Sequence, residues 1–165
     1  IIQFVPDANN STRTAQNSGE QTGYGMEFEA VWEAAENFTL TGNIAVQNST
    51  DETLDVPAAK SPEKQLYLRA DWILPSGWRV NLRANWVMDR NRLSDDVRPD
   101  IDDYALFDLS VRKTLANSLE FALTANNLFD EDAREPSPNS DPMPFIPNDL
   151  PLSGRALLGE VRYNF

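Results

Sequence analysis

Apolar and polar residues alternate along most of the chain with a period of two. In the stretch WRVNLRANW, residues 78–86, the even-numbered positions are apolar or aromatic and the odd-numbered positions are Arg or Asn. Successive side chains of a β-strand point to opposite faces, so this stretch predicts a strand with one apolar and one polar face. Two surroundings suit such a strand: a sheet packed on a protein core, or a membrane barrel between lipid and an aqueous lumen.

The same alternation predicts an all-β, antiparallel protein. Further strands are expected in the segments 24–33, 38–47, 66–72, 107–112, 119–126 and 157–165. With a stub at 1–5, this makes about eight strands of roughly ten residues. Strands of globular proteins have about five or six residues, whereas a tilted membrane-spanning strand needs about 9–11. The strand length therefore favours a transmembrane barrel.

The connections between these strands alternate in length. Short ones lie near 33–37, 74–77 and 114–118, and long polar ones near 6–22, 49–63, 90–102 and 130–153. Short turns at one end and long loops at the other are typical of an outer-membrane β-barrel.

Aromatic residues gather near both ends of the predicted strands. Beside the short turns lie Trp32, Phe38, Trp72, Trp78, Tyr163 and Phe165, and beside the long loops lie Tyr24, Trp86, Tyr104 and Phe129. Because amphipathic rings prefer the headgroup level of a bilayer, we expect two aromatic girdles. The alternative is that aromatic residues are common in any strand.

Composition excludes several classes of function. The 165 residues carry a net charge of −12, which argues against nucleic acid as a partner, and they include neither Cys nor His. The usual general base, zinc ligands and nucleophilic triads are therefore missing. The sequence has no run of about 18 apolar residues, so it predicts no transmembrane helix. The opening IIQFVPDANN lacks an initiator Met and a signal-peptide pattern, so we expect a processed chain or part of a longer one.

The C-terminal third carries an ordered set of motifs. Its members are Asn127, Leu128, Phe129 and Asp130 at the end of one strand, Pro151, Gly154 and Arg155 before the last strand, and Tyr163 and Phe165 at the terminus. This ordered set resembles the end of TonB-dependent outer-membrane receptors. Upstream, Gly25, Met26 and Glu27 are similar to the family's Gly-x-Glu strand opening.

This resemblance implies a barrel of about 22 strands that is filled by a plug domain. Residues 1–165 resemble the C-terminal part of such a barrel without its plug. The implied function is uptake of a scarce ligand, such as a ferric siderophore, cobalamin or a glycan, across the outer membrane of a Gram-negative bacterium. The implied partners are the plug, the TonB complex, outer-membrane lipid and lipopolysaccharide, and the barrel assembly machinery, which would read Tyr163 and Phe165. No catalytic residue, cofactor or metal is implied.

The polar phase of the strands predicts a charged lumen wall. An Arg side chain on the lipid face would cost about 2–4 kcal/mol at the bilayer midplane. The positions of the charged residues in the alternation therefore indicate which face of the sheet contacts water. We expect contacts with the plug, or with a ligand, from eleven residues: Glu27, Glu29, Arg69, Asp71, Arg79, Arg83, Asp108, Arg112, Glu120, Glu160 and Arg162.

The long loops hold most of the acidic residues and most of the prolines. The acidic clusters suggest either solvated loops or a calcium site, although SDDVRPDIDD lacks the spacing of an EF-hand loop. EPSPNSDPMPFIPNDLP has six prolines in 17 residues, which excludes a helix or a central strand. It is either a semi-rigid external loop that folds over the barrel and contacts ligand, or a plain spacer.

Two other architectures remain open from the sequence. A complete eight-stranded barrel with a structural or adhesion role would close with side chains filling its interior. A soluble β-sandwich that binds a ligand would bury the apolar face of each strand against a second sheet.

Overall fold

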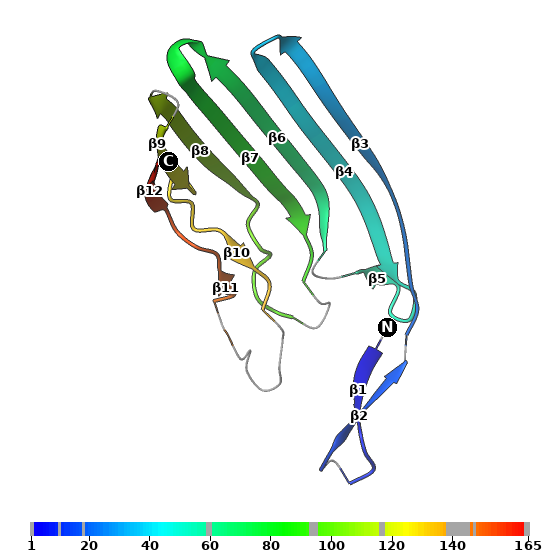
Figure 1. Cartoon of the computed structure of the whole chain (residues 1–165). Coiled ribbons are helices and arrows are strands. Elements are labelled where there is room, and N and C mark those ends of the chain that lie inside the picture. Colours follow the sequence, from blue (N-terminus) through cyan, green and yellow to red (C-terminus); the bar gives the residue numbers. More distant parts are fainter. Residues whose placement is uncertain are drawn as a thin grey trace.

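The protein is built on one antiparallel sheet of long strands (Figure 1). The computed structural model describes residues 2–9, 11–17, 19–58, 61–92, 96–115, 118–137, 146 and 148–163. The main strands are β3 (Gln21–Ala35), β4 (Phe38–Asp51), β6 (Pro62–Leu74), β7 (Trp78–Arg90), β8 (Tyr104–Leu115), β9 (Leu119–Asn126) and β12 (Ala156–Tyr163). They are ordered β12-β9-β8-β7-β6-β4-β3, and the short β5 (Val56–Pro57) pairs antiparallel with the end of β4. Among the described residues, no helix has the length and apolar character needed to cross a membrane.

The expected strand stub at the N-terminus is not part of this sheet. Instead, β1 (Ile2–Pro6) pairs with β2 (Arg13–Asn17), and the two form a separate hairpin that lies beyond the long-loop end of β3 (Figure 1). The intervening turn is rich in Asp and Asn, which favour turns, and Asp7 N donates to Thr12 O at 3.0 Å. The long polar connection expected at residues 6–22 therefore contains a strand, β2, that was not predicted.

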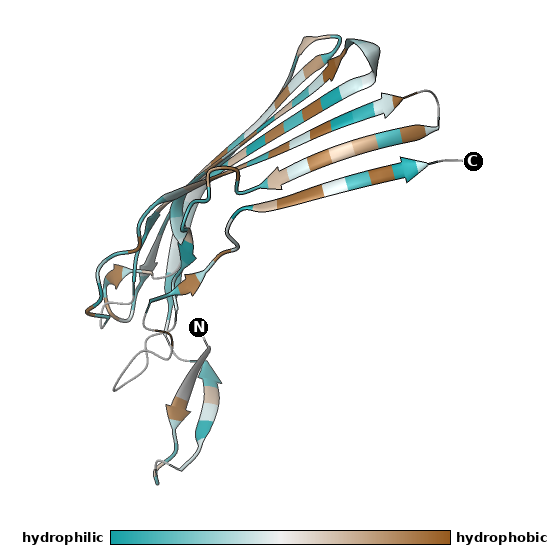
Figure 2. Cartoon of the chain, turned by 90° about the vertical axis from the view of Figure 1, so that its left-hand side faces the viewer, coloured by the Kyte–Doolittle hydropathy of each residue, from teal (hydrophilic) through white to brown (hydrophobic). Residues whose placement is uncertain are grey.

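The pairing register keeps the apolar positions of neighbouring strands together. One apolar row crosses the sheet through Trp72, Val80, Val111 and Leu123, which are direct partners on successive strands. Figure 2 shows the resulting alternation of hydrophobic and hydrophilic residues along each strand. The period-two pattern thus becomes two chemically different faces.

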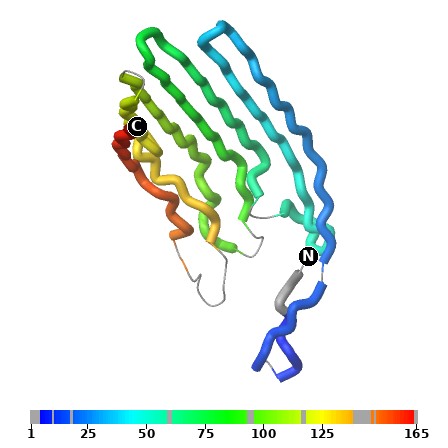
Figure 3. The backbone as a smooth tube through the Cα atoms, viewed as in Figure 1, coloured from blue at the N-terminus to red at the C-terminus, as the bar shows by residue number. Residues whose placement is uncertain are grey.

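The sheet forms a single curved layer, as Figures 2 and 3 show from two sides. The chain exposes 11834 Å², whereas a globular monomer of 18.6 kDa exposes about 8,200 Å². Large apolar side chains such as Phe28, Trp32 and Val161 are more than 60% exposed. No second sheet covers this face in the described part of the chain, so the β-sandwich is not favoured. The edges β3 and β12 do not pair with each other, so a closed eight-stranded barrel is not favoured either.

The short connections lie together at one end of the sheet, at the top of Figure 1. The β6–β7 turn is the 3-10 turn Pro75–Gly77, in which Ser76 and Gly77 have φ of 62° and 80°. A Cβ on Gly77 would lie 2.8 Å from the carbonyl oxygen of Thr114, so a side chain here would collide with β8. The PSG signal thus marks a tight turn, as expected.

Apart from Phe165, which lies outside the described residues, the aromatic residues follow the expected two-ended arrangement with one exception. Phe38 and Trp72 make an edge-to-face contact with ring centres 6.0 Å apart near the short turns, and Phe107 makes edge-to-face contacts with both Trp86 and Phe129 near the long loops. Tyr104 is the exception: it pairs with Val87 on the charged face and is only 8% exposed. The expectation that it joins a girdle is wrong, because Tyr104 shares the parity of Asp108 rather than that of Phe107.

Candidate functional site

The eleven predicted wall residues all lie on the face opposite the apolar rows, and together they are called the charged wall. The register aligns Arg69 with Arg83 and Arg83 with Asp108 across three strands. Arg83 Nη2 lies 3.5 Å from Asp108 Oδ2. The phase predicted from the sequence is thus the phase in the structure, while contact with a plug or ligand stays a prediction.

The central part of the charged wall is held by Asp71. Arg69 Nε lies 2.7 Å from Asp71 Oδ2, and Asn81 Nδ2 donates to Asp71 Oδ1 at 2.7 Å. The contact joins β6 to β7 through side chains as well as through the backbone ladder. Asn81 was part of the predicted polar phase but was not expected to orient an acidic residue.

A second group of charges crosses β8, β9 and β12. Arg112 pairs with Glu120, and Arg162 lies 2.8 Å from Glu160 and 3.6 Å from Glu120. Arg112 Nη1 also lies 3.9 Å from Glu160 Oε1. Alternating charges in one network stabilise each other more than isolated surface pairs do. This network ties the edge strand β12 to the sheet.

Two charges of the wall have no such partner. The side chains of Glu29 and Arg79 make no hydrogen bond or ion pair with any residue that the structure describes. Arg79 lies directly opposite Arg112, and like charges at that position repel each other. By contrast, Glu27 accepts a hydrogen bond of 2.6 Å from Asn43. Arg79 is therefore the wall arginine most in need of an anion from outside this sheet.

The arginines of the wall surround a wide, open hollow of about 610 Å³. Its charged and polar lining includes Tyr67, Arg69, Asp71, Arg79, Asn81, Arg83, Ser110, Arg112 and Thr124. Four of these residues are cationic and one is anionic, although the chain as a whole carries −12. Arg69, Arg83 and Arg112 pair with Asp71, Asp108 and Glu120, so Arg79 is the lining arginine that has no anion among the described residues.

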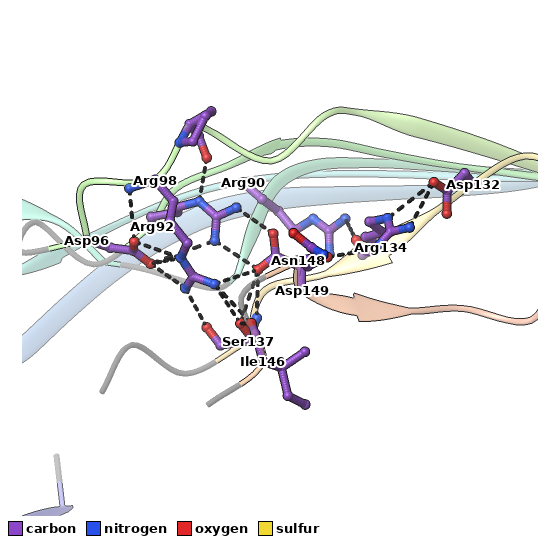
Figure 4. Close-up of polar contacts among 11 residues, drawn as sticks. Arg90, Arg92, Asp96, Arg98, Asp132, Arg134, Ser137, Ile146, Asn148 and Asp149 are labelled. Atoms are coloured by element: carbon purple, nitrogen blue, oxygen red, sulfur yellow. Dashed lines mark hydrogen bonds and ion pairs between the residues drawn. The ribbon is translucent and has the colours of Figure 1, made fainter. Parts of the chain in front are cut away.

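A separate cluster of ion pairs joins two long loops (Figure 4). This loop cluster comprises Arg92, Asp96, Arg98, Ser137 and Asp149. Arg92 binds Asp149 in a bidentate manner, with Nη1–Oδ1 and Nη2–Oδ2 distances of 2.9 and 2.6 Å. Their side chains are only 7% and 11% exposed. The pair connects residues 57 positions apart, from the β7–β8 loop to the segment before β11 (Leu150–Pro151).

Arg98 completes the loop cluster. Its Nη2 lies 2.5 Å from Asp96 Oδ2, and its Nη1 donates to Ser137 Oγ at 2.7 Å. Ser137 N donates in turn to Asp149 Oδ1 at 3.1 Å. The two arginines therefore hold both described ends of the proline-rich segment. Its residues 138–145 and 147, on which the choice between lid and spacer depends, lie outside the described residues.

The arginines hold the acidic groups of the loop cluster in their ionised form. Hydrogen bonds from Arg92 lower the pKa of Asp149 well below its usual value, against the opposing effect of burial. Hydrogen bonds from Arg98 lower the pKa of Asp96 in the same way. The cluster is therefore fully charged over the whole physiological pH range.

The same loops make further contacts at the edge of the sheet. Arg90 pairs with Glu135 in β10 (Arg134–Glu135), and Tyr104 donates to Glu135 Oε1 at 2.8 Å. Arg134 lies 3.0 Å from the exposed Asp132. Among the described residues, no group of three or more acidic side chains is placed to hold a metal ion.

The Asn-Leu-Phe-Asp motif forms the junction between β9, the following loop and the last strand. Asn127 is buried with φ of 47°, and its Nδ2 donates to the carbonyl oxygens of Glu131 and Ser153 at 2.9 and 3.2 Å. Asp130 Oδ1 accepts the N–H of Arg155 at 2.8 Å. Leu128 N donates to Phe107 O at 2.7 Å, while the exposed Phe129 contacts Phe107 edge to face. The motif therefore positions the start of β12.

The predicted assembly signal is described only in part. Tyr163 ends β12 on the apolar face, opposite Leu119, and is 59% exposed. Phe165 lies outside the described residues. Recognition of either residue by an assembly machinery stays a prediction.

The loop cluster was missed by sequence reasoning. Asp96 belonged to a cluster that was interpreted as solvated or calcium-binding, and Asp149 to the proline-rich segment that was interpreted as an external loop or a spacer. Arg92 and Arg98 were not singled out. The signal that was available is the presence of both arginines inside the acidic loop RNRLSDDVRPD, where each needs an anion.

The fold and the charged wall define this chain as a segment of an outer-membrane type β-barrel. The family described as "TonB dependent receptor-like, beta-barrel" matches residues 1–128, and the chain belongs to this family. No curated protein was found to match the sequence.

Solved structures of similar fold are TonB-dependent receptors. The FpvAI–pyocin S2 complex matches with a TM-score of 0.74 and 19% identity, over 98% of this chain and 21% of that chain. The copper transporter OprC matches at 0.71 and 18%, over 99% and 26%. The ferripyoverdine receptor of the outer membrane of Pseudomonas aeruginosa, bound to ferripyoverdine, matches at 0.74 and 16%, over 100% and 23%. The chain thus spans about a quarter of the length of these receptors, and the likeness confirms the barrel fold.

Proposed function

We propose that this chain forms part of the barrel wall and external loops of a TonB-dependent importer for a scarce ligand such as a ferric siderophore, cobalamin or a glycan. The observation that carries the proposal is the single-layer sheet with one charged and one apolar face. Because no second layer covers the apolar face in the described chain, such a sheet suits a position between lipid and a polar interior. Its two free edges would pair with further strands of a larger barrel, because unpaired backbone groups are not tolerated in lipid.

In this proposal the charged wall faces a plug domain. Arg79 supports this assignment, because it opposes Arg112 and has no anionic partner in the described chain. A carboxylate of the plug would relieve that repulsion and hold the plug in the hollow beside Arg69 and Arg83. Release of the plug would require this contact to break, which links the wall to energy supplied through the TonB complex.

The long loops would face the outside of the cell. The loop cluster holds the β7–β8 loop against both described ends of the proline-rich segment, so the two loops present one preformed surface. Preformed loops bind a ligand with a smaller loss of conformational entropy. The outer-membrane location, contact with lipopolysaccharide and reading of Tyr163 and Phe165 by the assembly machinery belong to the same proposal.

Uptake by the complete protein that contains this chain tests the proposal. It would be expressed in Gram-negative cells that lack their own receptors, which would be supplied with ⁵⁵Fe-labelled hydroxamate and catecholate siderophores, labelled cobalamin and labelled oligosaccharides. We expect uptake of one of these probes, abolished by a protonophore.

Arg79→Gln removes a contact that must break before the plug is released, so it should raise the uptake rate up to about fivefold, the factor for one charged contact of about 1 kcal/mol. Arg13→Gln, which removes the same charge from the N-terminal hairpin, should leave uptake unchanged. Recovery of the protein in the soluble fraction, or absence of energy-dependent uptake for every probe, would contradict the proposal.

A further inference from the structure

From the row of Trp78 to the row of Met88, the apolar face carries two charged residues in the described strands, and both are lysines. In the described strands, Lys113 pairs with Trp78 in the row beside the short turns, and Lys64 pairs with Met88 in the row beside the long loops. The positions between them on this face are apolar. Two cations at opposite limits of an apolar surface indicate two different polar boundaries.

The spacing of these lysines matches the thickness of a membrane. Along β7 the rows of Trp78 and Met88 are ten residues apart. At about 3.3 Å per residue and a tilt of about 40°, this corresponds to about 25 Å along the bilayer normal. The apolar band of outer-membrane barrels is also about 25 Å tall. Lys113 would therefore lie at headgroup level on the short-turn side, if the chain is placed in the membrane as proposed above.

The two lysines differ in their partners. Lys64 Nζ lies 2.7 Å from Asp89 Oδ2. Lys113 pairs with no carboxylate in the described part of the chain; it donates to the carbonyl oxygen of Ser76 and lies 5.0 Å from the ring centre of Trp78. An ammonium group has three N–H donors, so two remain for an external acceptor. An anion at this place would complete the contacts of Lys113.

An apolar groove starts at this ammonium group. It has a volume of about 510 Å³ and is lined by Trp78, Val111, Phe121 and Leu123, with Lys113 at its short-turn end. Trp78 and Phe121 flank Lys113 on the two neighbouring strands. An apolar groove with a single cation at the membrane boundary is complementary to one class of molecule, a lipid with an acidic headgroup.

We propose that Lys113 and this groove form a binding site for an anionic phospholipid of the leaflet at the short-turn side. An acyl chain lies along Val111 and Leu123, and the headgroup phosphate accepts hydrogen bonds from Lys113. The indole of Trp78 holds the ammonium group at the headgroup level. The site rests on the membrane placement in the proposed function, but it does not depend on which ligand is imported.

Native mass spectrometry of the complete protein, titrated in detergent with phosphatidylglycerol or phosphatidylcholine, tests the site. We expect a preference for phosphatidylglycerol. Lys113→Gln and Lys113→Met should each lower its affinity about fivefold, since one lysine near an anionic surface contributes about that factor. Lys113→Arg should retain the preference, and Leu123→Trp, which fills the groove, should weaken binding of both lipids.

Lys64→Gln is the matched control, because it removes the same charge from the opposite boundary. An equal loss with Lys64→Gln, or unchanged phosphatidylglycerol affinity in both neutral variants at position 113, would overturn the site. Heat-modifiable migration in gels shows that each variant is folded. Loss of uptake with intact lipid preference would contradict the proposed function alone, whereas intact uptake without lipid preference would contradict this site alone.

Discussion

Replacing Asp149 by Asn is the sharpest test of the loop cluster. The carboxylate accepts two hydrogen bonds from Arg92, one from Arg98 at 3.3 Å and one from Ser137 N. Asn keeps the size and one acceptor but removes the charge, and its amide group faces the Arg92 guanidinium with N–H donors. A hydrogen bond to a charged group contributes about 1.5–3 kcal/mol, and these side chains are nearly buried, so we expect a loss of about 2–3 kcal/mol of local stability.

Hydrogen exchange measures this loss directly. A change of about 2–3 kcal/mol corresponds to about 30- to 150-fold faster local opening. The reporters are the amide of Ser137, which donates to Asp149, and that of Leu152, which donates to Ala133 O at 2.9 Å. Amides in the centre of β7 should keep their protection, because the backbone ladder of the main sheet does not include these loops.

Asp132→Asn is the matched control, since Asp132 also pairs with an arginine but its side chain is 73% exposed. Exposed pairs contribute about 0–1 kcal/mol, so exchange at Ser137 should hardly change. If Asp149→Asn left the exchange of Ser137 and Leu152 unchanged, or accelerated it equally throughout β7, the loops would not be held by this cluster.

Three further predictions concern pH, the apolar face and the family motif. The pKa values of Asp149 and Asp96 are lowered in the folded protein, so the stability that their ionised forms contribute is complete above the ordinary Asp pKa of about 3.9. This stability is lost as the pH falls through the lowered pKa values. The exchange rate of the Ser137 amide, corrected for its intrinsic rate, should therefore be equal at pH 7 and pH 5 and should rise only below about pH 4. Leu82→Arg places a charge on the apolar face and should lower the free energy of unfolding in vesicles, measured by guanidinium titration, by about 2–4 kcal/mol. Asn81→Arg, on the opposite, charged face, should lower it much less. Equal losses would refute the assignment of the faces. Asn127→Ala should lower local stability by about 2–3 kcal/mol, because it removes side-chain bonds to Glu131 and Ser153 at a buried position, and faster proteolysis of the loop after β9 with intact β6–β8 would show it.

The family motif can be recognised in the sequence, but its structural role cannot be read from it. The order of Asn127, Asp130 and Gly154 is visible in the sequence and indicates the family, which the family match confirms. Their physical task is visible only in the structure, where Asp130 accepts the N–H of Arg155 and a Cβ on Gly154 would lie 3.2 Å from Asp130 Oδ1. The motif brings two chain segments together across a loop of more than 20 residues.

The sequence by itself determined the seven long strands of the main sheet, their two faces, the positions of the short turns and the family. These features are local, since a strand alternates its side chains every residue whatever lies around it, and a turn such as Pro75–Gly77 depends on adjacent residues. The face on which Tyr104 lies also follows from its parity with Asp108, whereas its burial comes from Ala133 and Glu135 in the loop after β9. Only the tertiary structure decided that the N-terminal stub pairs with β2 instead of the sheet, and that Arg92 meets Asp149 across 57 positions. Such contacts depend on how long loops fold back over one another, and no repeating pattern in the chain encodes that path.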